Sequence, residues 1–272
     1  MQSSLFDLKG RICVITGGLG QLGHQFTNAL VLHGARVAVL DISDKPTDIK
    51  RRYGDNWDRE AINFIACDIT KRADLENALE QIKSRWGTPT GLINNAALDS
   101  PPDSPQEENG PFEFYPEDSW DRVMRVNVKG TMLACQVIGG AMALEQGGSI
   151  INVSSIYGII SPDQSIYQYR RDRGDEFYKP VAYSASKSAI FNLTRYPATY
   201  WGKKNVRVNT VTFAGVFNNQ DREFLTGYLP KVPMGRMAKE DDFNGTIVYL
   251  MSQASSYMTG ANIVVDGGFT AL

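Results

Sequence analysis

The sequence contains little of the material from which metal centres and histidine-based catalytic sites are built. Its 272 residues include only two histidines, His24 and His33, and three cysteines, Cys13, Cys67 and Cys135. Two histidines leave little scope for a Ser-His-Asp triad, and the cysteine spacing matches no zinc-binding pattern. We therefore expect no metal site, and we expect the cysteines to be buried, reduced thiols.

Net charge and long apolar runs are also scarce. The formal net charge is −2, whereas a nucleic-acid-binding surface needs a clear basic excess. No apolar run reaches the length of about 18 residues that a membrane-spanning helix needs. Residues 1–11 contain no apolar core of the kind found in secretory signals. These observations predict a cytoplasmic protein that binds neither nucleic acid nor membranes.

What the sequence does contain is a regular alternation of two patterns. Hydrophobic residues make up 42% of the chain, which is enough for a sizeable core. Short apolar runs rich in β-branched residues predict strands that are buried on both faces of a parallel sheet, at residues 12–16, 37–40, 63–66, 91–93, 149–153, 206–211 and 263–265. Helical patterns lie between them, at residues 21–33, 73–86, 120–144, 183–201 and 241–251.

This alternation predicts an α/β fold made of successive βαβ units. We expect a Rossmann-type, doubly wound parallel sheet of about seven strands, with helices on both faces. No repeat or linker divides the chain, so residues 1–272 are predicted to form a single domain. Three segments interrupt the rhythm, at about residues 98–116, 161–180 and 214–236, and we expect them to form substrate loops.

A glycine-rich turn follows the first predicted strand and leads into a helix. Gly18, Gly20 and Gly23 fit the G-x-G-x-x-G pattern of dinucleotide-binding proteins. Glycine allows the backbone to approach a pyrophosphate closely, and the N-terminus of the helix offers free N–H groups to it. The candidate cofactor-binding residues of this turn are Gly17, Gly18, Gly20, Gln21, Leu22 and Gly23.

Asp41 ends the second predicted strand. An acidic residue at this place accepts hydrogen bonds from the adenosine ribose hydroxyls. A carboxylate repels the additional phosphate of NADP, and no arginine follows Asp41 directly, so the sequence favours NAD over NADP. The alternative is that Asp41 serves only as a turn residue or a helix cap. Neighbouring strand ends supply the other candidates for the cofactor groove, which are Ile42, Asp68, Ile69, Asn95, Ala96 and Ala97.

Tyr183 and Lys187 are four residues apart in a predicted helix, so they share one face of it. An ordinary tyrosine has a pKa of about 10, which is too high for a base at neutral pH. A neighbouring ammonium group favours the phenolate and lowers this pKa, so the pair suits acid/base catalysis. Ser155 ends the preceding strand. Asn127 is a polar residue in an otherwise apolar helix, where its alternative role is to bend or cap the helix.

The chain resembles the short-chain dehydrogenase/reductase family from end to end. The matching segments are TGGLGQLG, NNAA, NVKG, NVSSIYG, YSASK, VRVN and VVDGG. The resemblance implies an NAD-dependent oxidoreductase that moves a hydride between nicotinamide and an alcohol or ketone carbon. It also implies a catalytic tetrad, which in this sequence consists of Asn127, Ser155, Tyr183 and Lys187.

The resemblance assigns a role to each member of the tetrad. Tyr183 exchanges a proton with the substrate hydroxyl, and Lys187 lowers the pKa of Tyr183 and binds the nicotinamide ribose. Ser155 holds the substrate oxygen, and Asn127 anchors a water molecule. Family members are generally dimers or tetramers, so we expect a homo-oligomer that binds a small-molecule substrate.

Besides Ala97, which replaces the last glycine of the family's NNAG segment, the chain departs from the family pattern at two further cofactor segments. The spacing of Gly17, Gly20 and Gly23 resembles that of longer nucleotide-sugar epimerases and dehydratases, so an NAD-retaining sugar epimerase or dehydratase is an alternative function. That class usually carries a longer C-terminal substrate domain. The second departure is Phe213-Ala214, which replaces the usual Pro-Gly. The residues that follow are expected to contact the nicotinamide carboxamide, and they are Gly215 and Val216.

The segment between Ser155 and Tyr183 is about twice as long as is usual in the family. It is rich in arginine, which suits carboxylate or phosphate, and in tyrosine, which stacks on sugar rings. We therefore predict a sugar, a sugar acid or another polyhydroxylated substrate, as in reductases of surface-sugar and flagellin-glycan pathways, which this segment resembles. The candidate substrate residues are Tyr157, Tyr169, Arg170 and Arg173. A hydroxysteroid or 3-oxoacyl reductase is a second alternative, in which this segment is only a solvated loop.

Overall fold

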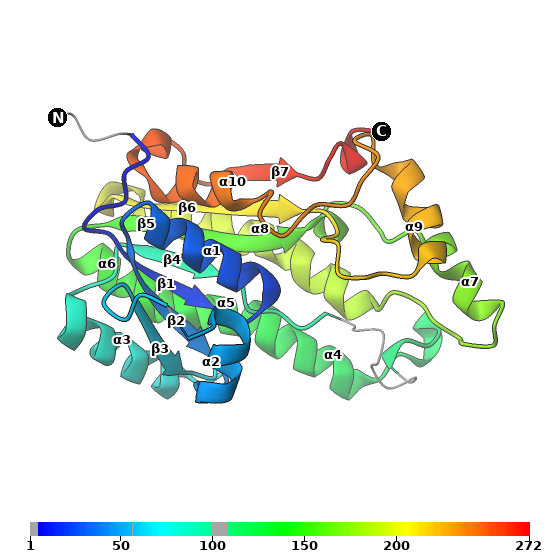
Figure 1. Cartoon of the computed structure of the whole chain (residues 1–272), viewed down its shortest axis with the longest axis horizontal. Helices are drawn as coiled ribbons and strands as arrows, with labels where there is room; N and C mark the ends of the chain where they lie inside the picture. Colours follow the sequence, from blue (N-terminus) through cyan, green and yellow to red (C-terminus); the bar gives the residue numbers. More distant parts are fainter. Residues whose placement is uncertain (1–4, 56, 100–107) are drawn as a thin grey trace.

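A seven-stranded parallel sheet forms the centre of the molecule, as the computed structural model shows for residues 5–55, 57–99 and 108–272 (Figure 1). The strand order is β3-β2-β1-β4-β5-β6-β7. The strands are β1 (Ile12–Thr16), β2 (Arg36–Asp41), β3 (Ile62–Ala66), β4 (Gly91–Asn94), β5 (Gly148–Ser155), β6 (Val206–Phe213) and β7 (Asn262–Val265). The predicted α/β fold with seven strands is therefore confirmed.

Helices cover both faces of the sheet. On one face, α1 (Gln21–Leu32) and α10 (Asn244–Met251) bury residues such as Phe26 and Ile247. On the other face lie α3 (Arg72–Trp86) and α8 (Val181–Trp201). Successive residues of a strand point to opposite faces, so Val14 belongs to one core and its neighbour Ile15 to the other. This burial on both faces explains why the strands are short apolar runs.

The strand order reverses between β1 and β4, so the loops that leave these strands run to opposite sides. In open α/β sheets a ligand crevice lies at this switch point, outside the carboxyl ends of the strands. A row of polar residues crosses the sheet near this edge, because Thr16, Asn94, Asn152 and Thr210 are in register on neighbouring strands. Asn94 donates to Asn152, and the row is buried. The carboxyl edge is therefore the part of the sheet where polar groups gather.

The predicted helix over residues 120–144 is longer and less regular than expected. It consists of α4 (Glu117–Met124), α5 (Thr131–Ala134) and α6 (Gly140–Leu144), joined by wider π-helical turns at Arg125–Gly130 and Cys135–Gly139. The first of these turns contains Asn127. Turns of this kind occur frequently at functional sites, because the wider turn redirects side chains.

Two of the segments predicted to be substrate loops contain helical structure that the sequence patterns did not predict. Residues 161–180 include a 3-10 turn at Gln164–Tyr167 and the short helix α7 (Gln168–Arg171), and residues 214–236 include α9 (Arg222–Tyr228). Aromatic packing joins the two segments, since the ring centroids of buried Tyr167 and half-buried Phe224 are 5.8 Å apart. In Figure 1, α7 and α9 lie beyond the carboxyl ends of the strands. In the third segment, at about 98–116, residues 100–107 lie outside the described residues.

The sequence patterns missed α2 (Pro46–Tyr53), which follows β2. All three cysteines are buried and form no disulfide.

Within the described ranges, no helix has the length and apolar character needed to cross a membrane. Among those same residues, no group of three or more His, Cys, Asp or Glu side chains is placed to hold a metal ion.

Candidate active site

The glycine-rich turn after β1 is packed so tightly that side chains would not fit. A Cβ atom at Gly18 would lie 2.4 Å from Val39 Cγ1, and one at Gly23 would lie 2.3 Å from the Gly17 carbonyl oxygen. Gly17 has φ +65°, a conformation that favours glycine. The first turn of α1 has neither a side-chain cap nor an acidic residue, so its N–H groups are available to an anion. This cradle fits the pyrophosphate of a dinucleotide.

Asp41 connects the end of β2 to the glycine-rich turn. Its carboxylate accepts hydrogen bonds from Leu19 N at 3.0 Å and from Ile42 N at 2.8 Å. On the other side of Leu19, Arg52 Nε of α2 donates to the carbonyl oxygen at 3.0 Å. Arg52 is eleven positions after Asp41 in the sequence, so its proximity to the glycine-rich turn was not predicted. The fold brings this cation to the glycine-rich turn because α2 folds back over it.

The other predicted cofactor residues have different roles, and only some of them line the cleft at the carboxyl ends of the strands. Asn95 holds β4 against the glycine-rich turn, because its side-chain nitrogen donates to the carbonyl oxygens of Thr16 and Gly17 at 3.2 and 3.0 Å. Burial tends to raise the pKa of Asp68, but hydrogen bonds from Thr70 outweigh this effect and the pKa is lowered. The predicted cofactor residues that line the cleft are Gln21, Leu22, Asn95, Ala97, Tyr183, Lys187, Gly215 and Val216.

A cleft of about 980 Å³ opens at the carboxyl ends of the central strands. The cleft is lined by Ser155 of β5 together with Tyr183 and Lys187 of α8. The long segment at residues 161–180, which we call the insertion, separates Ser155 from Tyr183 in the sequence. Lys187 Nζ lies 5.7 Å from the centroid of the Tyr183 ring. Helical periodicity places these two residues on the same face, and the contact of α8 with β5 brings Ser155 to them.

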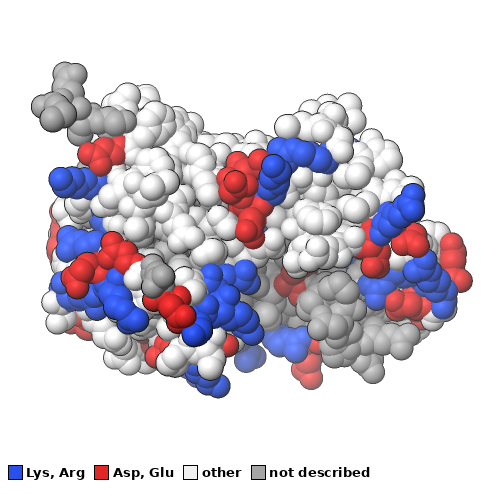
Figure 2. Space-filling view, viewed as in Figure 1, with Lys and Arg blue, Asp and Glu red and all other residues white. Residues whose placement is uncertain are grey.

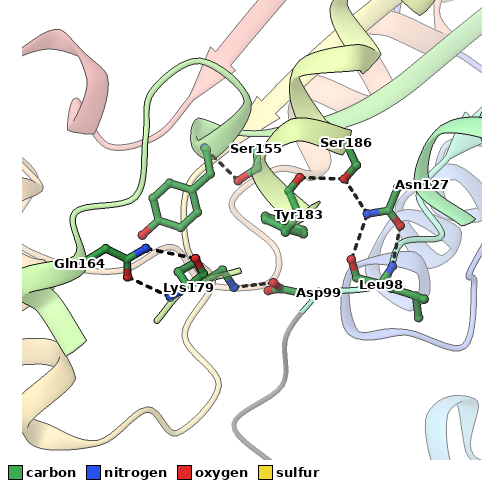
Figure 3. Close-up of polar contacts among 9 residues, drawn as sticks. Leu98, Asp99, Asn127, Ser155, Gln164, Lys179, Tyr183 and Ser186 are labelled. Atoms are coloured by element: carbon green, nitrogen blue, oxygen red, sulfur yellow. Dashed lines mark hydrogen bonds and ion pairs between the residues drawn. The ribbon is translucent and has the colours of Figure 1, made fainter. Parts of the chain in front are cut away.

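Hydrogen bonds distinguish the two serines at the end of β5. Ser154 Oγ donates to the Lys187 carbonyl oxygen at 2.8 Å, so it holds α8 against the sheet. Ser155 Oγ accepts from Tyr157 N at 3.2 Å (Figure 3), and a side-chain interaction of Ser155 with Tyr183 lowers the pKa of the tyrosine. Ser155 is thus the serine whose hydroxyl group faces the tyrosine.

Burial changes the acidity of both titratable groups in this trio. It lowers the pKa of Lys187 to about 8, although the Asp99 carboxylate acts in the opposite direction. Burial and then the Asp99 charge raise the pKa of Tyr183, while the hydrogen bond from Ser155 lowers it. The net effect on Tyr183 is opposite to the lowering that the sequence analysis expects from Lys187. Lys187 Nζ instead donates to the Val153 carbonyl oxygen at 3.0 Å.

Asn127 is buried and is not among the residues that line the cleft. Its Oδ1 accepts a hydrogen bond from Leu98 N at 2.7 Å, and its Nδ2 donates to Leu98 O at 3.0 Å and to Ser186 Oγ at 2.9 Å (Figure 3). It therefore links the segment after β4 to the helix that carries Tyr183. This side chain positions the backbone of the site.

The Phe213-Ala214 departure is accommodated by aromatic packing. Phe213 ends β6 and stacks on Phe243, with ring centroids 4.0 Å apart. After it, Tyr228 Oη accepts a hydrogen bond from Gly215 N at 2.8 Å. The backbone that lines the cleft at Gly215 is therefore held by α9, without the usual Pro-Gly sequence.

The predicted substrate residues all line the cleft, but their polar groups already have partners in the protein. Arg170 pairs with Asp175 at 2.6 Å, and Arg173 pairs with Glu223 at 2.6 Å. Tyr169 Oη donates to Asp221 Oδ2 at 3.1 Å, and Tyr157 is buried. Basic and acidic side chains alternate at the end of the molecule where Figure 1 places α7 (Figure 2). The charges of Arg170 and Arg173 are therefore balanced by protein carboxylates, so the two arginines do not indicate an anionic substrate.

Two further residues of the cleft, Lys179 and Asp99, were not predicted individually, although they lie in the segments 161–180 and 98–116 that were predicted as substrate loops. Their side chains form an ion pair, and Lys179 Nζ lies 4.9 Å from the centroid of the Tyr183 ring. The Lys179 side chain is 9% exposed and that of Asp99 is 53% exposed. They are 80 residues apart in the chain, so no local pattern could connect them.

Known proteins share this arrangement over nearly the whole chain. A family model described as Enoyl-(Acyl carrier protein) reductase matches residues 20–270. D-threitol dehydrogenase of Mycolicibacterium smegmatis is 29% identical over 97% of this chain and 95% of that protein. 2-(S)-hydroxypropyl-CoM dehydrogenase 3 of Xanthobacter autotrophicus is 31% identical, covering 97% and 98%.

A solved structure agrees with these sequence relatives. The crystal structure of a short chain dehydrogenase from Leptospira borgpetersenii with bound NAD+ superposes with a TM-score of 0.84 at 28% identity, covering 99% of this chain and 96% of that one. The match includes the glycine-rich turn, the parallel sheet and the helix that carries Tyr183 and Lys187. The chain therefore belongs to the short-chain dehydrogenase/reductase family of nicotinamide-dependent oxidoreductases.

Proposed function

We propose that the protein is an NAD-dependent dehydrogenase that interconverts an alcohol and a ketone on a sugar, a sugar acid or another polyhydroxylated compound. The observation that carries this proposal is the shared cleft of Ser155, Tyr183 and Lys187, which opens at the strand edge beside the glycine-rich turn. The name of the similar D-threitol dehydrogenase supports a polyol substrate. The polar residues that line the cleft beyond Tyr183 also support it, and they are Asp99, Tyr169, Lys179, Asn218, Asn219, Gln220 and Asp221.

The side chains of the cleft suit proton transfer to and from a hydroxyl group. Bound nicotinamide would supply the hydride acceptor for this reaction. Tyr183 accepts the substrate proton during oxidation and returns it during reduction, and Ser155 holds the substrate oxygen through its hydroxyl group. Lys187 Nζ lies 5.7 Å from the centroid of the Tyr183 ring, and its protonated ammonium group stabilises the Tyr183 phenolate. Asn127 keeps the Leu98 backbone at the edge of the cleft.

We infer that NAD is preferred over NADP. The Asp41 carboxylate at the end of β2 supports this preference, since it would repel the additional phosphate of NADP. The residues that would hold the cofactor are those of the glycine-rich turn together with Asp41, Asn95 and Lys187. We further propose that residues 1–272 act as one cofactor-binding domain.

We also propose that the protein is a homodimer or homotetramer that works in the cytoplasm. Tyr196 and Tyr200 support self-association through α8, because their stacked rings are 73% and 65% exposed. The neighbouring Trp201 is buried and belongs to the core. Free, buried thiols are consistent with a reducing compartment. Light scattering after size-exclusion chromatography would measure the oligomeric state.

The test is cofactor-linked turnover, followed through NADH absorbance, with a panel of polyols, sugars, sugar acids, hydroxysteroids and 3-oxoacyl thioesters. We expect turnover of a polyhydroxylated compound with NAD. We expect Tyr183→Phe to lower kcat by about 10²- to 10⁴-fold while NADH binding persists. Tyr257→Phe, at a fully exposed tyrosine to which no role is assigned, is the matched control and should keep full activity.

Each other outcome contradicts part of the proposal. Undiminished turnover by Tyr183→Phe would remove Tyr183 from the mechanism. Turnover of steroid or acyl compounds alone would show that the polar cleft does not select the substrate. NAD that co-purifies and is not consumed, with no turnover of the panel, would favour a sugar epimerase or dehydratase.

A further inference from the structure

Two separate clamps hold the Asp99–Lys179 ion pair in the cleft. Asn127 binds both backbone polar groups of Leu98, the residue before Asp99. Gln164 binds both backbone polar groups of Lys179, because its Nε2 donates to Lys179 O at 3.1 Å and its Oε1 accepts from Lys179 N at 2.9 Å. Figure 3 shows these two clamps on either side of Tyr183. These hydrogen bonds thus hold the backbone of Leu98, next to Asp99, and the backbone of Lys179 itself.

The pair also lies close to the reacting group. Lys179 Nζ is 4.9 Å from the Tyr183 ring centroid, and both members of the pair line the cleft. A polyol that presents one hydroxyl group to Tyr183 carries its next hydroxyl group on the adjacent carbon. An ammonium group donates hydrogen bonds and a carboxylate accepts them, so the pair can bind one or two such hydroxyl groups.

The charges of the cleft argue against an anionic substrate at this place. The Lys179 ammonium already faces the Asp99 carboxylate, and Arg170 and Arg173 face Asp175 and Glu223. A substrate carboxylate would have to displace Asp99 from a lysine whose side chain is only 9% exposed. Leaving Asp99 near an added negative charge is unfavourable, whereas a neutral hydroxyl group can join the pair without separating the charges.

We propose that Asp99 and Lys179 form a substrate subsite that binds the hydroxyl groups next to the one being oxidised, and that this subsite selects uncharged polyols over sugar acids. This inference rests on the proposed dehydrogenase function and narrows its substrate class. It assigns specificity to two residues that lie outside the Ser155, Tyr183 and Lys187 trio.

The experiment compares three alcohols in the NAD-linked assay. Threitol has neighbouring hydroxyl groups, butan-2-ol has a secondary hydroxyl group without such neighbours, and threonate is the acid with the threitol carbon chain. We expect the kcat/KM ratio of threitol to butan-2-ol to fall by about 10- to 100-fold in Lys179→Met, because hydrogen bonds to a charged group are lost. Lys179→Arg should restore part of the ratio, because it keeps a cationic donor.

Asp99→Asn tests the proposed selection against sugar acids, because it should favour threonate, the acid in this comparison. This substitution at a half-exposed side chain leaves Lys179 as a cation without its carboxylate partner. We expect the ratio of threonate to threitol to rise by about tenfold or more, since the freed ammonium group can bind the substrate carboxylate. The double variant Asp99→Asn with Lys179→Met should lose this gain.

Controls separate binding from folding. Lys83→Met breaks the ion pair of Lys83 with Glu145, far from the cleft, and should leave both ratios unchanged. NADH binding should be the same in all variants. If wild-type protein turns over no polyhydroxylated compound, the proposed substrate class and this inference both fail. If it turns over threonate but no uncharged polyol, the proposed function stands and this inference fails. If it turns over threitol but the ratios of the Asp99 and Lys179 variants match wild type, only the subsite is disproved.

Discussion

Asn127 and Leu98, which lines the active-site cleft, share two hydrogen bonds although they are 29 positions apart in the chain. The amide group of Asn127 pairs with the backbone N–H and C=O of Leu98 as a neighbouring strand would. Its third hydrogen bond, to Ser186, reaches the helix of Tyr183. One buried side chain therefore connects the loop after β4 to α8 through hydrogen bonds.

This relationship predicts that Asn127→Ala lowers both stability and turnover. Two backbone groups of Leu98 would lose their partners, which should lower the free energy of unfolding by about 1–3 kcal/mol. We expect kcat to fall more than NADH binding, since the change moves the loop that carries Asp99. Urea unfolding and steady-state kinetics measure the two effects. Asn28→Ala, at an exposed position of α1, should change neither, and an equally small effect of both substitutions would show that the clamp does not matter.

The pH dependence of alcohol oxidation should respond to Asp99. Oxidation requires deprotonated Tyr183, and burial followed by the Asp99 charge raises the pKa of this tyrosine. Activity should therefore increase with pH into the alkaline range. The groups that face Tyr183 are Asp99, Lys179, Lys187 and Tyr157.

Asp99→Asn removes a negative charge and also frees the Lys179 cation, and both effects favour the phenolate. The pKa of Tyr183 should decrease, so the acid limb of the kcat/KM profile should move to lower pH. Asp172→Asn, at an exposed residue of the insertion, is the control and should leave the profile in place. A movement of the Asp99→Asn profile toward higher pH would contradict this electrostatic interpretation.

The preference for NAD should depend on Asp41, with Arg52 as a secondary influence. Asp41→Ser removes the carboxylate but keeps an acceptor for Leu19 N, so the glycine-rich turn should persist. We expect the NADP to NAD ratio of kcat/KM to rise by about tenfold or more. Adding Arg52→Ala should reverse part of this gain, because the guanidinium group at Leu19 can attract the additional phosphate. Asp44→Ser, at an exposed residue nearby, tests whether any loss of charge suffices.

The close packing of the glycine-rich turn predicts a strong effect of Gly23→Ala. The new Cβ atom would lie 2.3 Å from the Gly17 carbonyl oxygen and 2.7 Å from Gly18 Cα, and these backbone atoms cannot move without reshaping the cradle. We expect NADH affinity to fall by about tenfold or more and stability to fall by about 1–3 kcal/mol. Fluorescence titration and urea unfolding provide the measurements.

Gly140→Ala is the matched comparison for this substitution. No atom lies within 4 Å of a Cβ at Gly140, which begins α6. Alanine is the better helix former by up to about 1 kcal/mol, so this variant should be as stable as wild type or more stable. Normal NADH binding by Gly23→Ala would mean that the turn does not contact the cofactor.

The predictions that succeeded depend on interactions within short segments. Each strand is buried on both faces, so a short apolar run such as residues 12–16 identifies it without reference to the rest of the chain. The common face of Tyr183 and Lys187 follows from the repeat of an α-helix. The glycine-rich turn between β1 and α1 is also a local arrangement, so its fit to a dinucleotide could be recognised from the sequence.

Features that depend on distant contacts were missed. The aromatic residues of the insertion pack against α9, and this contact stabilises the short helix α7 in a segment without an apolar period. The arginines of that segment were interpreted as ligands for an anion, but Arg170 and Arg173 are paired with acidic residues in the folded chain. A sequence shows the charges but not which of them lie together.

The same division separates the catalytic pair from the residues around it. Residues four apart on one helix are neighbours in any protein that forms that helix, so the Tyr183–Lys187 pair is a consequence of local sequence. The Asp99–Lys179 pair joins residues 80 positions apart, and the low pKa of Lys187 results from burial by the surrounding fold. Such long-range pairings and desolvation exist only after the sheet, α8 and the insertion have packed together, because both depend on distances that the linear chain does not contain.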